Sequence, residues 1–142
     1  MTTFKPIVSV STTMAASATD VWEAATHWTG VMFMGSKVST NWHAGHSITL
    51  KGKQYKDRGK VATFQRNKLL EFTYYSPLSG KADEPDNYNL VSISLQSTDG
   101  GTQVTITQSL AANAEPPDDE TLKEFEKNWQ AMLENLRSAA EK

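Results

Sequence analysis

The sequence has no cysteine among its 142 residues. This absence excludes disulfide bonds, thiolate nucleophiles and cysteine-ligated zinc or iron–sulfur centres. Long hydrophobic runs are also missing, because the longest fully apolar stretch is Val31–Met34 and a membrane helix needs ~20 residues. The N-terminal residues lack the apolar core of a secretory signal. We therefore expect a cytoplasmic protein that crosses no membrane.

The chain has no excess of positive charge. Its 14 Lys and Arg residues stand against 16 Asp and Glu residues, so a nucleic-acid partner is not expected. Basic residues gather locally between Lys51 and Lys68, and acidic residues gather from Glu115 onward. The solvated faces of a hairpin and of a helix explain these clusters most simply, and docking of an acidic partner on the hairpin is the alternative.

Length and composition are those of an ordinary folded globule. Hydrophobic residues make up 38% of the chain and charged residues 21%, which is far from a disordered composition. A chain of this length fits within one domain, and it can bury enough surface to fold without a metal or a cross-link. We expect residues 1–142 to form a single domain with no cofactor.

Alternating apolar and polar residues predict strands in seven places. A period of two is the pattern of a half-buried strand, and Asp99-Gly100-Gly101 has the composition of a hairpin turn between the last two. Within 55–66, the alternation places Asp57, Val61 and Thr63 on the inward face. The predicted strands cover residues 7–14, 38–42, 46–50, 55–66, 70–74, 91–95 and 104–106.

Helical signals occur in two regions. Ser17-Ala-Thr-Asp20 is typical of a helix start, and a second short helix is predicted over 27–34. The strongest periodic signal follows Pro116-Pro117, where apolar residues recur at helical spacing. These residues are Leu122, Phe125, Trp129, Met132, Leu133, Leu136 and Ala140. The sequence thus predicts an α+β fold, in which a curved antiparallel sheet of about six or seven strands wraps around a long C-terminal helix.

Several motifs, taken in order, are similar to those of a known family. They are Ala18-Thr-Asp-Val-Trp22, Trp42-x-x-Gly45, Gly59, Leu70-x-Phe-x-Tyr74, Gly101-Thr-Gln-Val-Thr-Ile106 and Trp129-x-x-x-Leu133-x-x-Leu136. On these motifs the chain resembles the START-related, birch-pollen-allergen-like (SRPBCC) helix-grip superfamily. Within it, the chain resembles bacterial homologues of the C-terminal domain of the activator of the ninety-kilodalton heat-shock-protein ATPase.

The resemblance implies a cavity between the sheet and the long helix that holds a small hydrophobic molecule. It implies no shared catalytic residues, because a fold does not fix a function. We expect Thr63, Tyr74 and Gln108, with His46, to face inward as polar anchors for a ligand or as partners of one another. The full candidate lining is Trp28, Phe33, Trp42, Ile48, Thr63, Phe72, Tyr74, Ile93, Gln108, Phe125, Trp129 and Met132.

Titratable residues offer a weaker signal for chemistry. His43 and His46 flank Gly45 at a strand bend, so their rings are expected to diverge. No nearby carboxylate completes a set of metal ligands, and we therefore predict no metal site. Asp57 would have a raised pKa if buried, although solvation at the strand end is the simpler expectation. Binding of a hydrophobic molecule is therefore the favoured function. A cyclase- or aromatase-like enzyme using Asp57 or His46 is one alternative, and contact with a chaperone ATPase is another.

Overall fold

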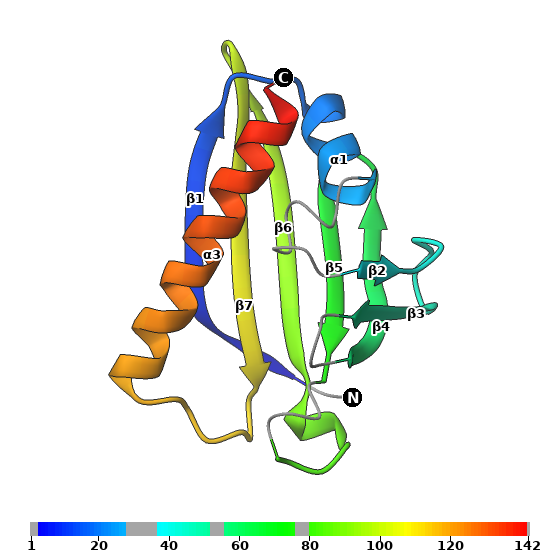
Figure 1. The fold of residues 1–142 in the computed structure, drawn as a ribbon, viewed down its shortest axis with the longest axis vertical. Coiled ribbons are helices and arrows are strands. Elements are labelled where there is room, and N and C mark those ends of the chain that lie inside the picture. Colours follow the sequence, from blue (N-terminus) through cyan, green and yellow to red (C-terminus); the bar gives the residue numbers. More distant parts are fainter. Residues whose placement is uncertain (1–2, 28–36, 52–55, 76–79, 142) are drawn as a thin grey trace.

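The computed structural model describes residues 3–27, 37–51, 56–75 and 80–141 (Figure 1). Its seven strands form one antiparallel sheet in the order β1-β7-β6-β5-β4-β3-β2. The α+β helix-grip prediction is confirmed, and the short helix predicted over 27–34 lies, after His27, outside the described residues. The elements are β1 (Phe4–Met14), α1 (Ala18–His27), β2 (Lys37–Ser39), β3 (Ser47–Lys51), β4 (Lys56–Gln65), β5 (Leu69–Tyr74), η2 (Pro85–Asn87), β6 (Asn89–Thr98), β7 (Gly101–Ala111) and α3 (Asp119–Ala140).

The alternation predicted for the strands appears as one apolar and one polar face. Val10, Ile106 and Ile93 are register neighbours across β1, β7 and β6, and each is at most 3% exposed. On the opposite face, the Ser11 and Thr105 hydroxyls lie 3.0 Å apart across β1 and β7. One face of the sheet is therefore the core and the other is hydrated.

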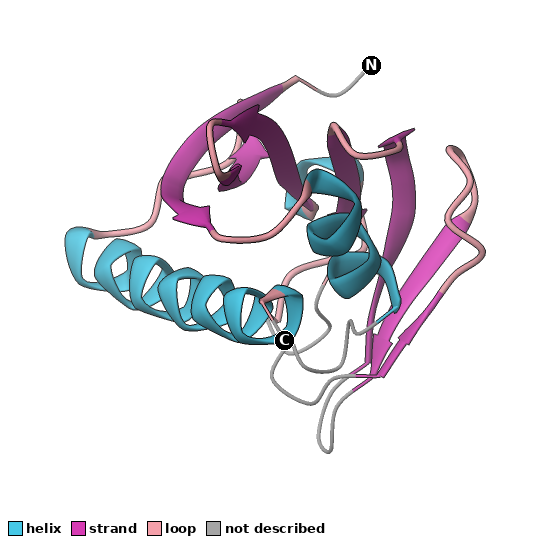
Figure 2. Ribbon diagram, turned by 90° about the horizontal axis from the view of Figure 1, so that it is seen from above, coloured by secondary structure: helices cyan, strands magenta, loops and turns pink. Residues whose placement is uncertain are grey.

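The C-terminal helix covers the core face, and the sheet curves around α3 and α1 (Figure 2). The Asp118 carboxylate begins α3 by accepting a hydrogen bond of 2.8 Å from the Thr121 amide. Its buried stripe of Trp129, Leu133 and Leu136 packs into the core, where α3 lies on β1 and α1. In the described part of the chain, no helix has the length and apolarity to cross a membrane.

Strand β4 is the corner of the sheet. Lys56 to Lys60 pair with β3 and the residues from Val61 pair with β5. Between them β4 is bonded on both sides, because Arg58 also pairs with Tyr75 and the Val61 amide donates to the His46 carbonyl. Gly59 lies in this doubly paired stretch. A Cβ atom there would lie 1.7 Å from the carbonyl oxygen of Thr73, so only glycine lets the two backbones approach so closely.

A bulge in β4 corrects the predicted facing of Thr63. The pairing register shifts between Val61 and Thr63, so one residue is inserted and the period of two breaks. Phe64, not Thr63, takes the next position against the core. Thr63 points to the opposite face, where its hydroxyl donates to Glu71 Oε1 at 2.9 Å.

The segment before β3 is the second correction. A strand was predicted over 38–42, but β2 ends at Ser39 and Trp42 has a φ of 58°. With Gly45 at a φ of 86°, residues 43–46 form a turn that the His46 amide closes by donating to the His43 carbonyl at 3.0 Å. This turn leaves His46 exposed, so the prediction that it faces inward is wrong.

We expect Gly59→Ala to lower the free energy of unfolding by about 3 kcal/mol or more, because the added methyl group overlaps backbone that cannot move alone. Gly45→Ala is the matched control, because a Cβ atom at Gly45 has no atom within 4 Å. Its loss of stability should be only the cost of placing alanine in the left-handed conformation, about 1–2 kcal/mol. Chemical denaturation of both variants measures the difference. Equal losses would contradict the corner assignment.

Candidate functional site

A chain of polar side chains crosses the core face of the sheet from α3 to β5. The Trp129 indole N–H donates to Gln108 Oε1 at 2.7 Å. The Gln108 amide nitrogen in turn donates to Asn89 Oδ1 at 3.2 Å and to the Tyr74 hydroxyl at 3.5 Å. Gln108 and Trp129 are buried, whereas Tyr74 and Asn89 keep part of their surface exposed. We call these four residues the polar network.

The sequence predicted three members of the polar network, and the structure brings them together. Tyr74, Gln108 and Trp129 were expected to face inward, and they do. Asn89 was missed, although it stands in phase with Val91 and Ile93 on β6 and pairs with Tyr74 in register. A polar residue that continues an apolar alternation was the available signal.

Asp57 lies beside the polar network. It is half-buried on the core side of β4, opposite Leu50 of β3, as the alternation predicted, and its Oδ1 atom is buried rather than solvated as expected for the strand end. Burial of the Tyr74 hydroxyl raises its pKa well above the ordinary value, and the negative charge of Asp57 raises it further. Tyr74 therefore stays protonated throughout the physiological range and can act as a hydrogen-bond donor.

The apolar candidates fall into two groups. Ile48, Phe72 and Ile93 are at most 1% exposed and belong to the packed core. Phe125 and Met132 of α3 are only partly buried and pack against the edge of that core. Phe125 and Met132 can therefore offer apolar surface to another molecule, whereas the three fully buried residues only support the site by packing in the core.

Trp42 has a different setting from the one expected of a lining residue. Its ring stacks on Phe64 at a centroid distance of 6.0 Å, and its indole N–H donates to the Thr26 carbonyl at 3.1 Å. Trp42 thus joins the end of α1 to β4. The candidates Trp28 and Phe33 lie outside the described residues.

The two histidines near Gly45 are both exposed. Their rings lie 5.6 Å apart in an edge-to-face contact rather than diverging as expected, because the turn at 43–46 brings them together. His46 Nδ1 lies 2.6 Å from the Asn41 side-chain nitrogen. Among the described residues, no group of three or more His, Asp or Glu side chains could hold a metal ion.

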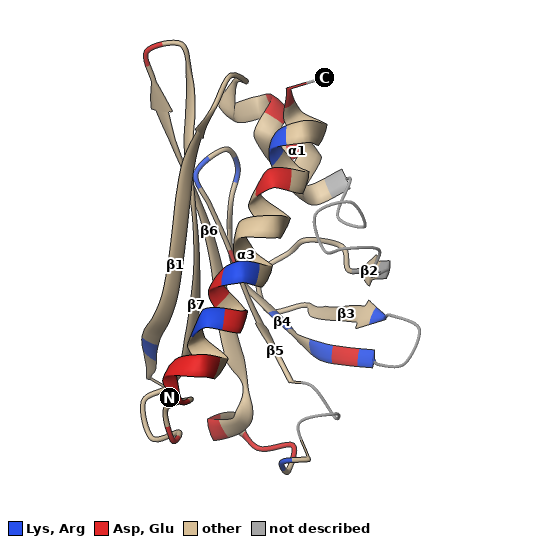
Figure 3. Ribbon diagram, turned by 60° about the vertical axis from the view of Figure 1, so that its left-hand side comes forward, with Lys and Arg blue, Asp and Glu red and all other residues tan. Residues whose placement is uncertain are grey.

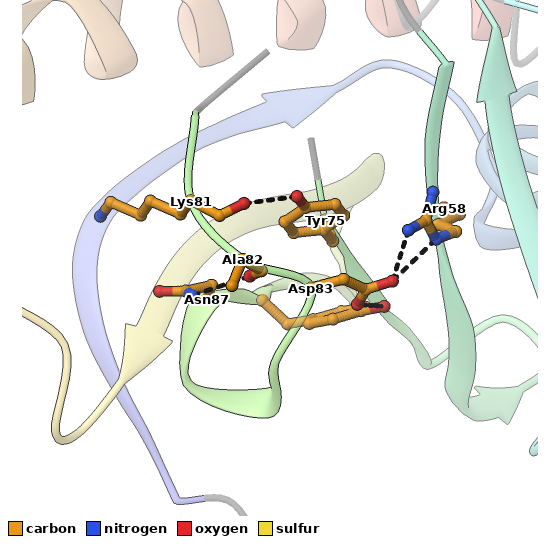
Figure 4. Close-up of polar contacts among 7 residues, drawn as sticks. Arg58, Tyr75, Lys81, Ala82, Asp83 and Asn87 are labelled. Carbon is orange, nitrogen blue, oxygen red and sulfur yellow. Dashed lines mark hydrogen bonds and ion pairs between the residues drawn. The ribbon is translucent and has the colours of Figure 1, made fainter. Parts of the chain in front are cut away.

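A second polar cluster joins β4 to the loop at 80–88 (Figure 4), and its Arg58 lies on the face of β4 opposite that of Asp57. Asp83 accepts hydrogen bonds from the Arg58 guanidinium and, at 2.6 Å, from the Tyr88 hydroxyl. The Tyr75 and Tyr88 rings stack with their centroids 5.5 Å apart. The Arg58 guanidinium carbon lies over the Tyr75 ring, 5.1 Å from its centroid. The Tyr75 hydroxyl donates to the Lys81 carbonyl at 2.5 Å. We call Arg58, Tyr75, Asp83 and Tyr88 the loop clamp, since they fix residues 80–88 to β4 and the end of β5.

No pattern in the sequence predicted the loop clamp. Arg58 and Asp83 are 25 residues apart, and residues 80–88 have no periodic pattern that would orient their side chains. Arg58 was predicted on the outward face of its strand, which is confirmed, but its partner depends on the path of the loop.

The comparisons with known proteins agree with this geometry. The model of the family described as activator of Hsp90 ATPase homolog 1-like protein matches residues 15–141. A solved Cytophaga hutchinsonii protein is 31% identical, with a TM-score of 0.78 over 92% of this chain and 90% of that one. No curated protein matches the chain.

More distant structures share the fold alone. The Aha1 dimer of Colwellia psychrerythraea is 18% identical, with a TM-score of 0.71 over 94% of this chain and 95% of that one. DynU16, a protein of the dynemicin biosynthetic locus, is 17% identical, with a TM-score of 0.74 over 92% of this chain and 45% of that one.

We expect the Asp83 carboxyl to titrate below its ordinary pKa, because Tyr88 and then Arg58 stabilise its charged form. The stability that the loop clamp gives should be present above the ordinary Asp pKa and lost as the pH falls through the lowered one. In Tyr88→Phe, the Asp83 pKa should rise, as followed by carbon NMR. Asp118 is the internal control, because its lowered pKa depends on Thr121. An unchanged Asp83, or a parallel shift of Asp118, would contradict the clamp.

Proposed function

Because the chain belongs to the family of activator of Hsp90 ATPase homolog 1-like proteins, in the START-related helix-grip superfamily, we propose that it binds a small, mostly apolar molecule. The site lies on the core side of the sheet, beside α3. The observation that carries this proposal is the polar network that joins α3 to β7, β6 and β5.

The cost of the polar network supports a role in binding. Tyr74, Asn89 and Gln108 occupy core-facing positions whose strand neighbours are Phe72, Val91 and Ile106. A buried polar group that loses its partner costs about 1–3 kcal/mol, so apolar residues would be the safer choice for stability alone. Gln108 has partners for both its amide oxygen and its amide nitrogen, whereas the residues Tyr74 and Asn89 keep part of their surface exposed, an arrangement that suits a site that receives a polar group.

The chemistry of the exposed end indicates which polar group fits. Tyr74 accepts the longest bond of the network and keeps its own proton, so its hydroxyl can donate to a ligand oxygen. Phe125 and Met132 add partly exposed apolar surface on α3. A ligand with an apolar body and a carbonyl or hydroxyl oxygen matches both features.

An enzyme using the same site is the second candidate. A cyclase-like activity requires an ionisable group on the core side of the sheet. Of the two candidates, Asp57 and His46, only Asp57 lies there. Its charge beside the Tyr74 hydroxyl gives a possible acid–base pair. Asp57→Asn separates the two functions, because it should leave ligand binding in place and abolish turnover of a bound polyketone.

Contact with a chaperone ATPase is what the family description suggests, as does the name of the Colwellia relative. We rank it below ligand binding, because the polar network on which the proposal rests lies on the core side of the sheet rather than on an exposed surface. Stimulation of a chaperone ATPase by this chain would reverse that ranking.

We expect Tyr74→Phe to weaken binding of prodan, a neutral naphthyl ketone, by about three- to tenfold, the worth of one hydrogen bond. Binding of N-phenylnaphthylamine, a neutral dye without a carbonyl, should stay unchanged in the same variant. Fluorescence titration measures both affinities, and circular dichroism checks the fold. Thr105→Ala, on the hydrated face of β7, is the matched control and should alter neither dye.

Two results would contradict the proposal. One is equal loss of both dyes in Tyr74→Phe, which would mean that the hydroxyl contacts no ligand oxygen. The other is failure of the unmodified protein to bind either dye, together with native mass spectrometry that finds no co-purifying compound.

A further inference from the structure

A pocket of about 940 Å³ lies on the side of the sheet opposite the core. Its walls come from β3, β4 and β5, from the loop at 80–88, and from Phe4 of β1. Thr49, Arg58 and Thr73 line it, and along their strands they alternate with Leu50, Asp57 and Phe72, which do not. The core residue Ile48 also borders it, but none of the four residues of the polar network does, so the pocket is distinct from the site proposed above.

The pocket carries positive charge that its own walls do not neutralise. Lys56, Arg58 and Lys60 line it, against the single carboxylate of Asp83. Asp83 is already engaged by Arg58 in the loop clamp. Lys56 and Lys60 are exposed and form no ion pair within the described ranges of the chain. Figure 3 shows the basic residues at the ends of β3 and β4.

The strand pairing itself places like charges together. Lys51 of β3 stands directly opposite Lys56 of β4 in the antiparallel register. Like charges directly opposite each other on a sheet are destabilising. An anion bound between the strands would offset this repulsion, and the neighbouring hydroxyls of Ser47 and Thr49 can donate to its oxygens.

The loop clamp gives the pocket a fixed apolar wall. Tyr88 is held by its ring contact with Tyr75 and by its hydrogen bond to Asp83. Pro85 begins η2, and the Asn87 side chain donates to the Ala82 carbonyl at 2.8 Å, which ties the loop to itself. With Phe4, these residues present ring surface beside the two lysines.

We propose that this pocket binds a small organic anion, with its charged group at Lys56 and Lys60 and its apolar body against Tyr88, Pro85 and Phe4. The volume is that of a small-molecule site, which favours this ligand over an extended polyanion. The charged group is a carboxylate or a phosphate monoester, both of which accept hydrogen bonds from ammonium and hydroxyl donors.

The test uses anilinonaphthalene sulfonate, which has the ring system of N-phenylnaphthylamine and adds one negative charge. The double variant Lys56→Gln/Lys60→Gln should weaken binding of the anionic dye by about tenfold or more, because two charge-assisted contacts are lost. It should leave the neutral dye unchanged. Lys123→Gln/Lys127→Gln on α3 is the control, because it makes the same change of charge at exposed positions away from the pocket.

Competition then identifies the class of anion. Displacement of the dye by a phenyl phosphate or by a phenyl carboxylate would support the proposal, provided that the Lys56→Gln/Lys60→Gln variant loses it. Which of the two compounds displaces the dye tells the two classes of anion apart. Equal displacement by inorganic phosphate would overturn the role of the apolar wall. An unchanged affinity for the anionic dye in the double variant, or displacement by a nucleic acid alone, would overturn the proposal. Each result is independent of Tyr74, so failure here leaves the core-side site untouched.

Discussion

The close backbone contact between Gly59 and Thr73 is the constraint on which the rest of the structure depends. It lets β4 approach β5 closely while β4 stays paired with β3 on its other side, so that the strands on both sides become one curved sheet. A flat sheet would offer α3 a plane to cover. The curved sheet instead surrounds α1 and α3 (Figure 2), and the loop at 80–88 lies at the end of the sheet away from α1 (Figure 1).

The two ends of the core face have different chemistry because different elements cover them. Toward the end covered by α1, Trp22 packs edge-to-face on Phe64 at 5.2 Å, and Trp42 stacks on the same ring. The buried hydroxyls of Thr26 and Thr102 at this end bond to backbone carbonyls, those of Trp22 and Ala16, rather than to other side chains. Toward the start of α3, the strands place Tyr74, Asn89 and Gln108 on the core face. There α3 contributes the indole N–H of its tryptophan, which donates to Gln108, rather than an aliphatic group. The helix therefore matches the polarity of the strands beneath it.

The sequence predicts the elements whose pattern is regular, and it fails where the backbone is irregular. Strand β1, the later strands and α3 follow simple periods, so their core faces were predicted correctly. The left-handed Trp42 and the bulge before Thr63 interrupt the period. Trp42 is held by its contacts with Thr26 and Phe64, and the bulge exists only in the pairing of β4 with β5. No local pattern contains that pairing. For the candidate site, residues on regular strands could be found, whereas a clamp between Arg58 and a distant loop could not.

Strand β4 shows why the outer face has to stay polar. Its sequence Lys56-Asp-Arg58 sends the carboxylate toward the core and both cations outward. Burying such a strand on both faces would leave charges without water, at a cost of several kcal/mol for each ion. Arg58 does not meet this cost, because about half of its side chain stays exposed while it pairs with Asp83. Lys56 and Lys60 have no such carboxylate in the pocket wall, so any molecule that displaces water from them has to bring negative charge of its own.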